Sequence, residues 1–272
     1  MTTGLSLPQN QNLKSPQTGS TNSKSGSFDE RGEPFKLAEK QDDYNLWPQR
    51  PVIIRLDGRA FHTYVKKAEF DRPFDHILHG AMKAAAKAVC KDAQNSRLAY
   101  TQSDETSILL YEKSEVAEPW FKNRTSKLCS IAASIATAYF NEAVGDRSHF
   151  AFFDARAFNL DVSQVRDYFA WRQEDAYRNS VAMLAQSHFS HRELHGVNRR
   201  GMMNMLDDIG IPWIELESWK RHGSTIIKSK RELKHPDTGA IYHRTVWESN
   251  PEHPLFKDDD KFDGTFLSCD DT

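Results

Sequence analysis

VIIRLDGRAFH, residues 52–62, begins as a short run of β-branched apolar residues and breaks off at Asp57-Gly58. Such a run predicts a buried strand, and the Asp-Gly pair predicts a turn at its end. An aspartate at the end of a buried strand exposes a carboxylate, and the glycine beside it lets another group approach the backbone closely. We therefore expect both the fold and the chemistry to be organised around this strand and its exit.

The residues that follow alternate between helical and strand patterns. An Ala-rich stretch with apolar residues at helical spacing is typical of a helix, and short apolar runs on either side of Ser103-Asp104-Glu105 are typical of a hairpin. In order, the predicted elements are a helix (75–92), two hairpin strands (98–100 and 107–111), a helix (121–143), a strand (150–158) and a long helix within 162–189.

This β-α-β-β-α-β order is that of the split βαβ, ferredoxin-type fold, an antiparallel sheet with two helices on one face. Polymerase palms and nucleotide cyclases share it, so the order does not fix a function. The expected class is α+β, with a palm-like core, additional helices and a C-terminal strand or hairpin segment.

Composition divides the chain into four parts. Residues 1–42 are rich in small polar residues and predict a disordered extension, because they bury too little to offset their ordering entropy. Residues 43–160 are the expected catalytic core, and 161–250 are an expected helical and hairpin extension with tRNA or oligomer contacts. Residues 251–272 are an expected acidic tail, with six Asp in its last sixteen residues.

Charge, cysteine content and hydropathy set limits on function. The formal net charge is −2, but residues 219–235 hold six Lys or Arg against Glu232, which favours a phosphate-bearing partner only weakly. Three scattered cysteines predict neither a disulfide framework nor a zinc site. No apolar run approaches the ~18 residues of a membrane span and no secretory signal is recognisable, so we expect a cytoplasmic protein without membrane contact.

Two carboxylates are expected to converge. The end of the first strand and the tip of the hairpin lie at the same end of a β-α-β-β sheet, which brings Asp57 and Asp104 together. Two carboxylates and a backbone carbonyl are hard oxygen ligands that suit Mg²⁺ holding a triphosphate, and a pair of such ions stabilises in-line displacement. The alternative is that Asp57 only caps a turn and Asp104 only occupies a hairpin loop, since Asp favours both places.

A triphosphate also needs cations. Arg124 and Lys127 are three residues apart at the predicted start of the second helix, where the helix dipole attracts anions. Positive side chains are locally unfavourable there unless they have an anionic partner, so a phosphate-binding role and a solvated surface remain equally open.

Several segments together resemble the tRNA-histidine guanylyltransferase family, in the family's order and across roughly residues 45–230. The matching segments are RLDGRAFH (55–62), FDRPFD (70–75), SDE (103–105), FKNRTSK (121–127), FDAR (153–156) and WRQED (171–175). Each fragment alone is unspecific, whereas the joint match is highly specific.

The resemblance implies a magnesium-dependent enzyme that adds nucleotides to the 5′ end of a tRNA in the 3′-to-5′ direction. It implies two Mg²⁺ ions held by Asp57, the carbonyl of Gly58 and Asp104, with Asp57 and Asp104 as the catalytic residues. The nucleotide-binding positions that it implies are Asp57, Gly58, Arg59, Ala60, Phe61, His62, Ser103, Asp104, Arg124, Lys127 and Asn179. ATP and GTP or another NTP are the implied substrates, and a homotetramer is the usual assembly. Glu105 is not assigned a metal bond.

The sequence departs from the family at one informative position. Eukaryotic guanylyltransferases have a His-Ile-Asn-Asn motif where this chain has Tyr177-Arg178-Asn179-Ser180. A phenol stays neutral near pH 7, whereas imidazole can carry charge. This departure favours the bacterial and archaeal guanylyltransferase-like branch, which repairs truncated tRNA 5′ ends against a template strand. The alternative is a tRNA-histidine guanylyltransferase that adds the extra 5′ G; a palm-type nucleotide cyclase and a non-catalytic tRNA-binding protein are more distant.

Overall fold

The computed structural model describes residues 28–41, 43–114, 116–145, 149–250 and 255–268. The chain divides into two units, residues 1–42 and 43–272. In the first unit the described part is one helix, α1 (Phe28–Lys40). The structure differs here from the expected disordered extension, because 35–40 supply residues with good helix propensity such as Leu, Ala, Glu and Lys. Residues 1–27 and 42 lie outside the described residues.

A six-stranded antiparallel sheet organises the second unit, with the strand order β4-β1-β3-β2-β5-β6. The first four strands have the ferredoxin-type order, so the predicted α+β class and palm-like core are confirmed. The strands are β1 (Val52–Gly58), β2 (Ser96–Gln102), β3 (Glu105–Leu110), β4 (Phe153–Asn159), β5 (Ser224–Lys234) and β6 (Ile241–Asn250).

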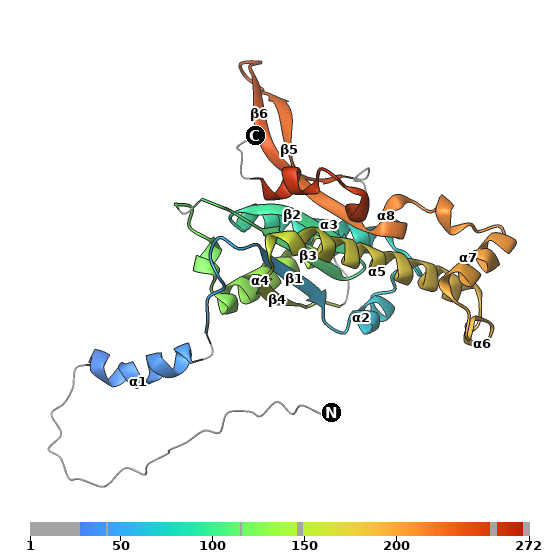
Figure 1. Ribbon diagram of the computed structural model, residues 1–272, viewed down its shortest axis with the longest axis horizontal. Helices are drawn as coiled ribbons and strands as arrows, with labels where there is room; N and C mark the ends of the chain where they lie inside the picture. The colour runs from blue at the N-terminus through green and yellow to red at the C-terminus, as the bar shows by residue number, and fades with distance from the viewer. Residues whose placement is uncertain (1–27, 42, 115, 146–148, 251–254, 269–272) are drawn as a thin grey trace, which may run out of the picture. The chain divides into compact units, whose positions relative to one another are not determined.

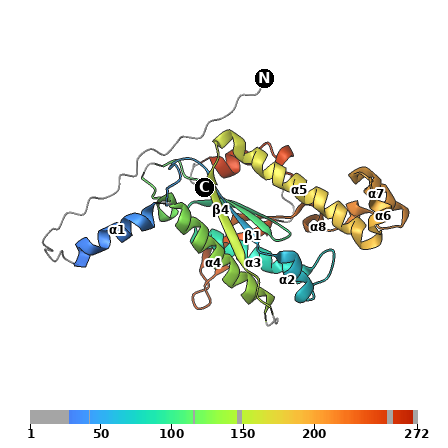
Figure 2. The ribbon, with the colours of Figure 1, turned by 90° about the horizontal axis from the view of Figure 1, so that it is seen from below.

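Helices cover both faces of the sheet (Figures 1 and 2). On one face, α3 (His76–Asp92) and α4 (Thr125–Val144) pack on alternate residues of β1, including Ile54 and Leu56. On the other face α5 (Val162–His188) packs on Ile53, the residue of β1 that precedes Ile54. Because side chains alternate across a strand, β1 is apolar on both faces, as a continuous apolar run predicts.

The described part of the expected acidic tail packs on the body of the protein. The predicted hairpin is β5–β6, and it extends well away from the body in Figure 1. Beyond it, η3 (Phe256–Asp258) and η4 (Asp263–Leu267) bury three rings against α5 and β2, those of Phe256, Phe262 and Phe266. For the described part, 255–268, the buried aromatic residues therefore outweigh its four aspartates. Residues 251–254 and 269–272 lie outside the described residues.

Two local elements differ from expectation. A short helix, α2 (Phe61–Lys67), follows β1, where the sequence analysis expects none. The second core helix begins at Thr125 rather than near 121, because η1 (Trp120–Asn123) precedes it with φ between 49° and 57° at Phe121, Lys122 and Asn123. Backbone hydrogen bonds with the 44–46 segment stabilise η1 and the start of α4. The Leu46 amide, for example, donates to the Asn123 carbonyl at 2.9 Å.

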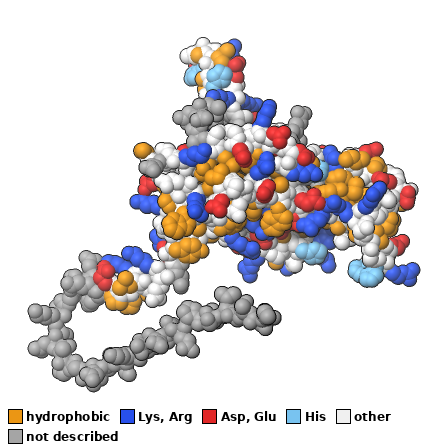
Figure 3. Space-filling model, in the orientation of Figure 1, with side chains coloured by type: hydrophobic (Ala, Val, Ile, Leu, Met, Phe, Trp, Pro, Cys, Tyr) orange, Lys and Arg blue, Asp and Glu red, His pale blue; other side chains and the backbone are white. Residues whose placement is uncertain are grey.

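The remaining short elements extend the far end of α5. They are α6 (His191–Leu194), α7 (Arg199–Asp208), η2 (Trp213–Glu215) and α8 (Ser218–His222). They enclose a separate small core that includes Val181, Leu206 and Trp213. On the face in Figure 3, acidic and basic side chains are interspersed over the body, in line with the small net charge. No helix among the described residues is long and apolar enough to cross a membrane.

Phe140 links α4 to the end of β1, and its removal is a direct test of this packing. Its side chain is fully buried, with ring centroids of Phe61, Tyr64 and Phe153 within 5.2–6.0 Å. We expect Phe140→Ala to lower the free energy of unfolding by about 3–5 kcal/mol in a denaturant titration. The neighbouring Tyr139 is 49% exposed, so Tyr139→Ala is the matched control. Equal losses from the two variants would contradict the packing described.

Candidate active site

The exit of β1 and the turn of the β2–β3 hairpin meet at one edge of the sheet. Asp57 pairs with Glu105 in the antiparallel register of β1 and β3. One position on, the Gly58 amide donates to the Asp104 carbonyl at 3.1 Å. Asp57 and Asp104 are thus close neighbours in space although they lie 47 positions apart in the sequence (104 − 57).

The hairpin turn itself orients Asp104. Gln102 pairs with Glu105, so the turn has two residues, and Ser103 adopts a positive φ of 48°. The Ser103 hydroxyl donates to Asp104 Oδ1 at 3.1 Å. The turn therefore presents the carboxylate from a constrained backbone.

Among the described residues, the acidic charge at this edge exceeds the basic charge that acts on it. Burial raises the pKa of the Asp104 carboxyl, and the nearby Asp57 carboxylate raises it further. Asp154 lies opposite Asp57 in the register of β1 and β4, which adds a third acidic residue to the same edge. Arg55 lowers the pKa of Asp104 only weakly, because its guanidinium bonds to Glu105. The edge is therefore suited to binding a cation.

The donor set fits magnesium rather than a transition metal. Within the part of the chain that the structure describes, no three His, Cys, Asp or Glu side chains form a group that could hold a metal ion. Two carboxylates, with a backbone carbonyl, water and phosphate oxygens completing the shell, match the usual coordination of Mg²⁺ with nucleotides. The unbalanced charge of Asp57 and Asp104 is the observation that supports this fit.

Gly58 has a steric reason to be glycine. A Cβ atom at this position would overlap the ring of Phe61, which is buried against Tyr64, Phe140 and Phe153. The chain turns sharply into α2 through Ala60, whose φ is 50°. The glycine thus lets α2 fold back against the strand end.

A pocket of about 530 Å³ opens beside this edge. Its walls come from α2, the 71–75 segment, the start of α3, the hairpin turn, the C-terminal half of α5 and residues 219–223. A volume of this size lies within the ~300–1,000 Å³ of small-molecule sites. Asp104 lines the pocket, whereas Asp57 does not. The charge of Asp57 nevertheless affects the pocket, because it raises the pKa of Asp104.

The far end of the pocket is aromatic. The indole of Trp219 stacks on the His79 ring, with centroids 4.2 Å apart and an angle of 13° between the planes. Burial lowers the pKa of His79 to about 3, so the imidazole is neutral at physiological pH. Its Nε2 lies 3.1 Å from the Ser224 hydroxyl. This end of the pocket is therefore a neutral, flat-ringed surface.

Most of the residues expected at the site do gather there. Those that line the pocket are Phe61, His62, Ser103, Asp104 and Asn179. Asp57 and Gly58 lie directly behind the turn, and Arg59 and Ala60 form the exposed link to α2. The Asn179 amide also donates to Asp175 Oδ2 at 3.4 Å, which holds it on the pocket side of α5.

Arg124 and Lys127 do not join them. They lie at the start of α4, whereas Phe140, sixteen residues or about 24 Å further along the helix, packs beside Gly58. The anionic partner that Arg124 requires is Asp43 of the same chain, which also accepts from the Ser126 hydroxyl at 2.7 Å. Within one chain α4 therefore keeps these two cations away from the pair of aspartates, and their contact with a triphosphate stays a prediction.

Glu105 braces the site instead of taking part in it. Its two oxygens accept from Arg172 at 2.6 and 2.7 Å, and Arg55 bonds to the same carboxylate. The side chains of Glu105 and Arg172 are 8% and 6% exposed. Burial raises the pKa of Glu105, and the two guanidinium groups oppose this. With both oxygens occupied, Glu105 ties the turn that carries Asp104 to α5.

Tyr177, the residue that departs from the family motif, is not among the residues that line the pocket. Its ring packs on Trp213 at 4.7 Å, and the Arg199 guanidinium lies 4.2 Å above it. Tyr177 therefore stabilises the joint between α5 and α7.

Part of the pocket could not be predicted from the sequence. Arg72, His79, Trp219 and Lys220 line it, but they come from three segments that only the tertiary fold brings together. Lys220 forms an ion pair with Glu217, with 2.7 Å between Nζ and Oε2. FDRPFD (70–75) was a signal for Arg72, whereas nothing in the sequence pairs His79 with Trp219.

Comparisons with known proteins agree on one family. A family model described as tRNAHis guanylyltransferase matches residues 32–161. The tRNA(His) guanylyltransferase of Candida glabrata is 32% identical over 210 residues, 73% of this chain and 78% of that protein. Arabidopsis thaliana tRNA(His) guanylyltransferase 2 is 30% identical over 217 residues, 74% of this chain, and the chain spans 40% of that protein's length.

Solved structures extend the similarity to the whole fold. A bacterial tRNA(His) guanylyltransferase-like protein in complex with ATP superposes with a TM-score of 0.77 at 33% identity. The match covers 89% of this chain and 99% of that one. Such a protein in complex with GTP gives a TM-score of 0.74.

Arg172 offers a test of the brace. Replacing it by Met leaves a buried carboxylate with one partner fewer, so we expect Arg172→Met to lower the free energy of unfolding by about 3–5 kcal/mol. Adding Glu105→Gln should recover part of this loss, measured as the coupling energy of a double-mutant cycle. Additive losses would mean that the two side chains do not depend on each other.

Asp104 offers a test of the unbalanced charge. A carboxyl whose folded pKa exceeds its unfolded value of 3.8 contributes stability while protonated, and this is lost as pH rises through the folded pKa. In chelator at pH 7, we therefore expect Asp104→Asn to have a higher free energy of unfolding than the wild type. The advantage should vanish at pH 3.5. Added Mg²⁺ should stabilise the wild type and not the variant. A less stable variant at pH 7 would contradict this.

Proposed function

The chain belongs to the tRNAHis guanylyltransferase family, and we propose that it is a tRNA nucleotidyltransferase that adds nucleotides to the 5′ end in the 3′-to-5′ direction. The observation that carries the proposal is the meeting of Asp57 and Asp104 beside a pocket of nucleotide size. Relatives named as guanylyltransferases, and a similar protein solved with ATP and with GTP, support the substrate class.

In this proposal the chain's own residues bind and orient the nucleotide. Two Mg²⁺ ions at Asp57, the Gly58 carbonyl and Asp104 would neutralise the triphosphate and stabilise the attacking and leaving oxygens. The Ser103 hydroxyl and the Arg72 guanidinium, which line the pocket, would bind phosphate oxygens. Trp219 and His79, at the other end, offer the flat neutral surface on which a base stacks.

The proposed reaction has two transfers. A 5′-monophosphate is a poor electrophile, so ATP first adenylylates it and pyrophosphate leaves. The 3′-hydroxyl of the incoming NTP then attacks the 5′ phosphate, and AMP leaves with the bonding electron pair. A 5′-triphosphate end needs no activation and releases pyrophosphate. The protein contributes positioning and charge neutralisation, as is usual for phosphoryl transfer.

Guanylylation of tRNA-histidine is the better supported form of this activity. The family model and the curated relatives named above all carry that activity in their descriptions. Template-dependent 5′-end repair is the second candidate, favoured by Tyr177. Because this side chain packs on Trp213 instead of lining the pocket, no ionisable group of the motif is available there to select guanosine.

Assembly gives Arg124 and Lys127 a role in the proposal. Both are exposed at the end of the sheet remote from the pair of aspartates in their own chain. In a homotetramer, the form that the family resemblance implies, they would contact a triphosphate held by another protomer. Residues 43–160 would then supply the catalytic core and 161–250 tRNA and subunit contacts, in a cytoplasmic enzyme.

A paired assay separates the two forms. One substrate is tRNA-histidine lacking the extra guanosine; the other is a tRNA missing its first nucleotide, and each NTP is supplied in turn. Guanylylation predicts G on the first tRNA whatever base lies opposite. Repair predicts the nucleotide complementary to the opposite base on both. Absence of 5′ addition to either tRNA would refute the proposed function.

Asp104→Ala is the catalytic control for this assay. We expect it to lower nucleotide addition by about 100-fold or more, because it removes charge stabilisation at the reacting phosphate. tRNA binding should stay nearly unchanged. Asp167→Ala, at an exposed aspartate of α5, is the matched variant and should keep full activity. Equal activity of both variants would remove Asp104 from the catalytic machinery.

A further inference from the structure

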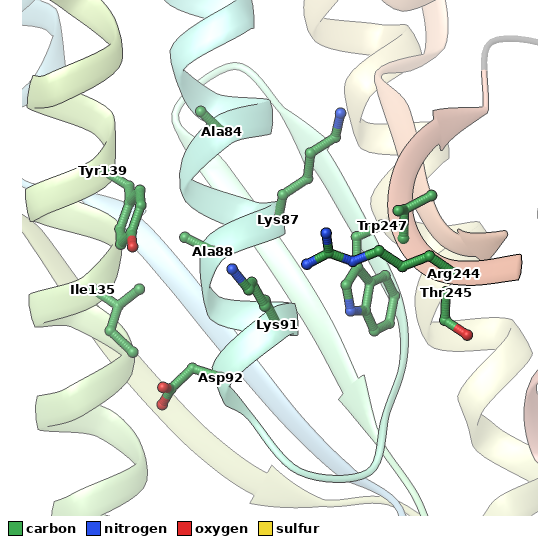
Figure 4. A pocket seen from close by; sticks show the side chains of 11 residues that line it. Ala84, Lys87, Ala88, Lys91, Asp92, Ile135, Tyr139, Arg244, Thr245 and Trp247 are labelled. Atoms are coloured by element: carbon green, nitrogen blue, oxygen red, sulfur yellow. The ribbon is translucent and has the colours of Figure 1, made fainter. Parts of the chain in front are cut away.

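A second pocket, of about 570 Å³, lies between α3, α4 and β6. It is on the face of the sheet away from α5, and none of the residues assigned to the candidate active site lines it. Figure 4 shows its floor on α3, one wall on α4 and the other on β6. We call it the α3–β6 pocket, and Lys87, Lys91, Tyr139, Arg244 and Trp247 carry its chemistry.

The hollow results from small residues between large ones. Ala84 and Ala88 are one helical turn apart on α3, so they leave the floor without side chains beyond Cβ. Tyr139 of α4 rises on one side, and Trp247 of β6 on the other (Figure 4). The two large rings thus border a space of the size that ligand sites have, about 300–1,000 Å³.

The walls are strongly basic. Lys87, Lys91 and Arg244 line the pocket against one acid, Asp92. Lys228 of β5 lies 5.4 Å from the centroid of the Trp247 ring. Among the described residues, no carboxylate lies within ion-pairing distance of any of these four cations. This is a concentration of positive charge that an anionic ligand would neutralise.

Like charges already strain this surface. Burial lowers the pKa of Lys228, and the positive charge of Arg97 lowers it further, while Cys90 and Glu112 oppose this in part. Burial likewise lowers the pKa of Lys83, together with the charge of Lys87. A bound polyanion would relieve this repulsion, so the charge pattern favours ligand binding over a merely solvated surface.

The α3 helix connects this pocket to the candidate active site. His79 lines the active-site pocket, and Lys83, Lys87 and Lys91 follow it at intervals of four, on one face of the helix. From His79 to Lys91 the rise along α3 is about 18 Å at 1.5 Å per residue. A tRNA whose 5′ end occupies the active site therefore has nucleotides within reach of the α3–β6 pocket.

We propose that the α3–β6 pocket binds an unpaired nucleotide of the tRNA, with its base on Trp247 and its flanking phosphates on Lys87, Lys91 and Arg244. The proposal rests on the proposed function for the identity of the RNA. Aromatic side chains that stack bases, set in a positive groove that follows the backbone, are the general means of binding single-stranded nucleic acid. A free triphosphate fits less well, because the pocket is at the C-terminal half of α3, where the helix dipole repels concentrated negative charge.

The charge contacts are tested by salt dependence. Lys87→Gln with Lys91→Gln removes two cations from the rim, and Lys257→Gln with Lys261→Gln removes two exposed lysines from the other face of the sheet. tRNA binding is followed by fluorescence anisotropy over a range of salt concentrations, without NTP. We expect the first pair to weaken binding and to reduce the slope of log K against log salt by about 1.4–1.8, at 0.7–0.9 per phosphate contact. The second pair should match the wild type. Equal slopes for both pairs would overturn the proposal.

The stacking contact is tested by ring replacement. We expect Trp247→Ala to raise the Kd for tRNA by about 5- to 100-fold, and Trp247→Phe to restore most of the affinity. Tyr139→Ala, at a half-exposed ring of the same pocket, provides a second reading if Trp247→Ala unfolds in a thermal melt. Unchanged tRNA affinity in a folded Trp247→Ala or Tyr139→Ala variant would overturn the proposal.

Two further measurements separate this site from the active site. The affinities for free ATP and GTP should be unaffected by Lys87→Gln with Lys91→Gln, and nucleotide addition should show a higher KM for tRNA with unchanged kcat. A loss of free-nucleotide affinity without a loss of tRNA affinity would overturn the RNA assignment. If the wild type adds no nucleotide to tRNA, the proposed function fails, whereas a selective loss of tRNA binding in the pocket variants still supports this site.

Discussion

The antiparallel register between β1 and β3 is the constraint on which the rest of the molecule depends. It pairs Asp57 with Glu105, and the Gly58 amide bonds to the Asp104 carbonyl at 3.1 Å. A shift of one residue would turn every side chain of β1 to the opposite face and separate the two aspartates. Such a shift would also move Arg55, which bonds to Glu105, to the apolar face of Ile54 and Leu56, so it is strongly disfavoured.

Holding acidic groups together requires support from outside the sheet. Burial and the charge of Asp57 both disfavour an ionised Asp104, so the site is electrostatically strained. Arg172 of α5 binds the neighbouring Glu105 through two hydrogen bonds and fixes the turn from the covering face. The same helix carries Asn179 into the pocket. One helix therefore covers the sheet, braces the turn and contributes a wall, which couples stability to the geometry of the site.

The helix α3 has a corresponding role on the other side. Its first turn meets the active-site pocket through His79, and its last turns form the floor and basic rim of the α3–β6 pocket. The hairpin β5–β6 closes that second pocket with Trp247 while β5 extends the sheet beside β2. The C-terminal additions to the palm-like core thus build the proposed nucleic-acid surface, and none of the residues of the candidate active site lines it.

The sequence by itself determined the palm-like core and the meeting of Asp57 with Asp104, because alternating helix and strand patterns and an Asp-Gly strand exit are local signals. It also placed Ser103 and Asn179 through the family resemblance. Only the tertiary structure decided that Arg124 lies at the remote end of α4 with Asp43, and that Trp219 stacks on His79. Only it showed that Phe256 and Phe262 anchor an acidic segment. These depend on which distant segments pack together, and a contact between distant segments leaves no periodic trace in the sequence.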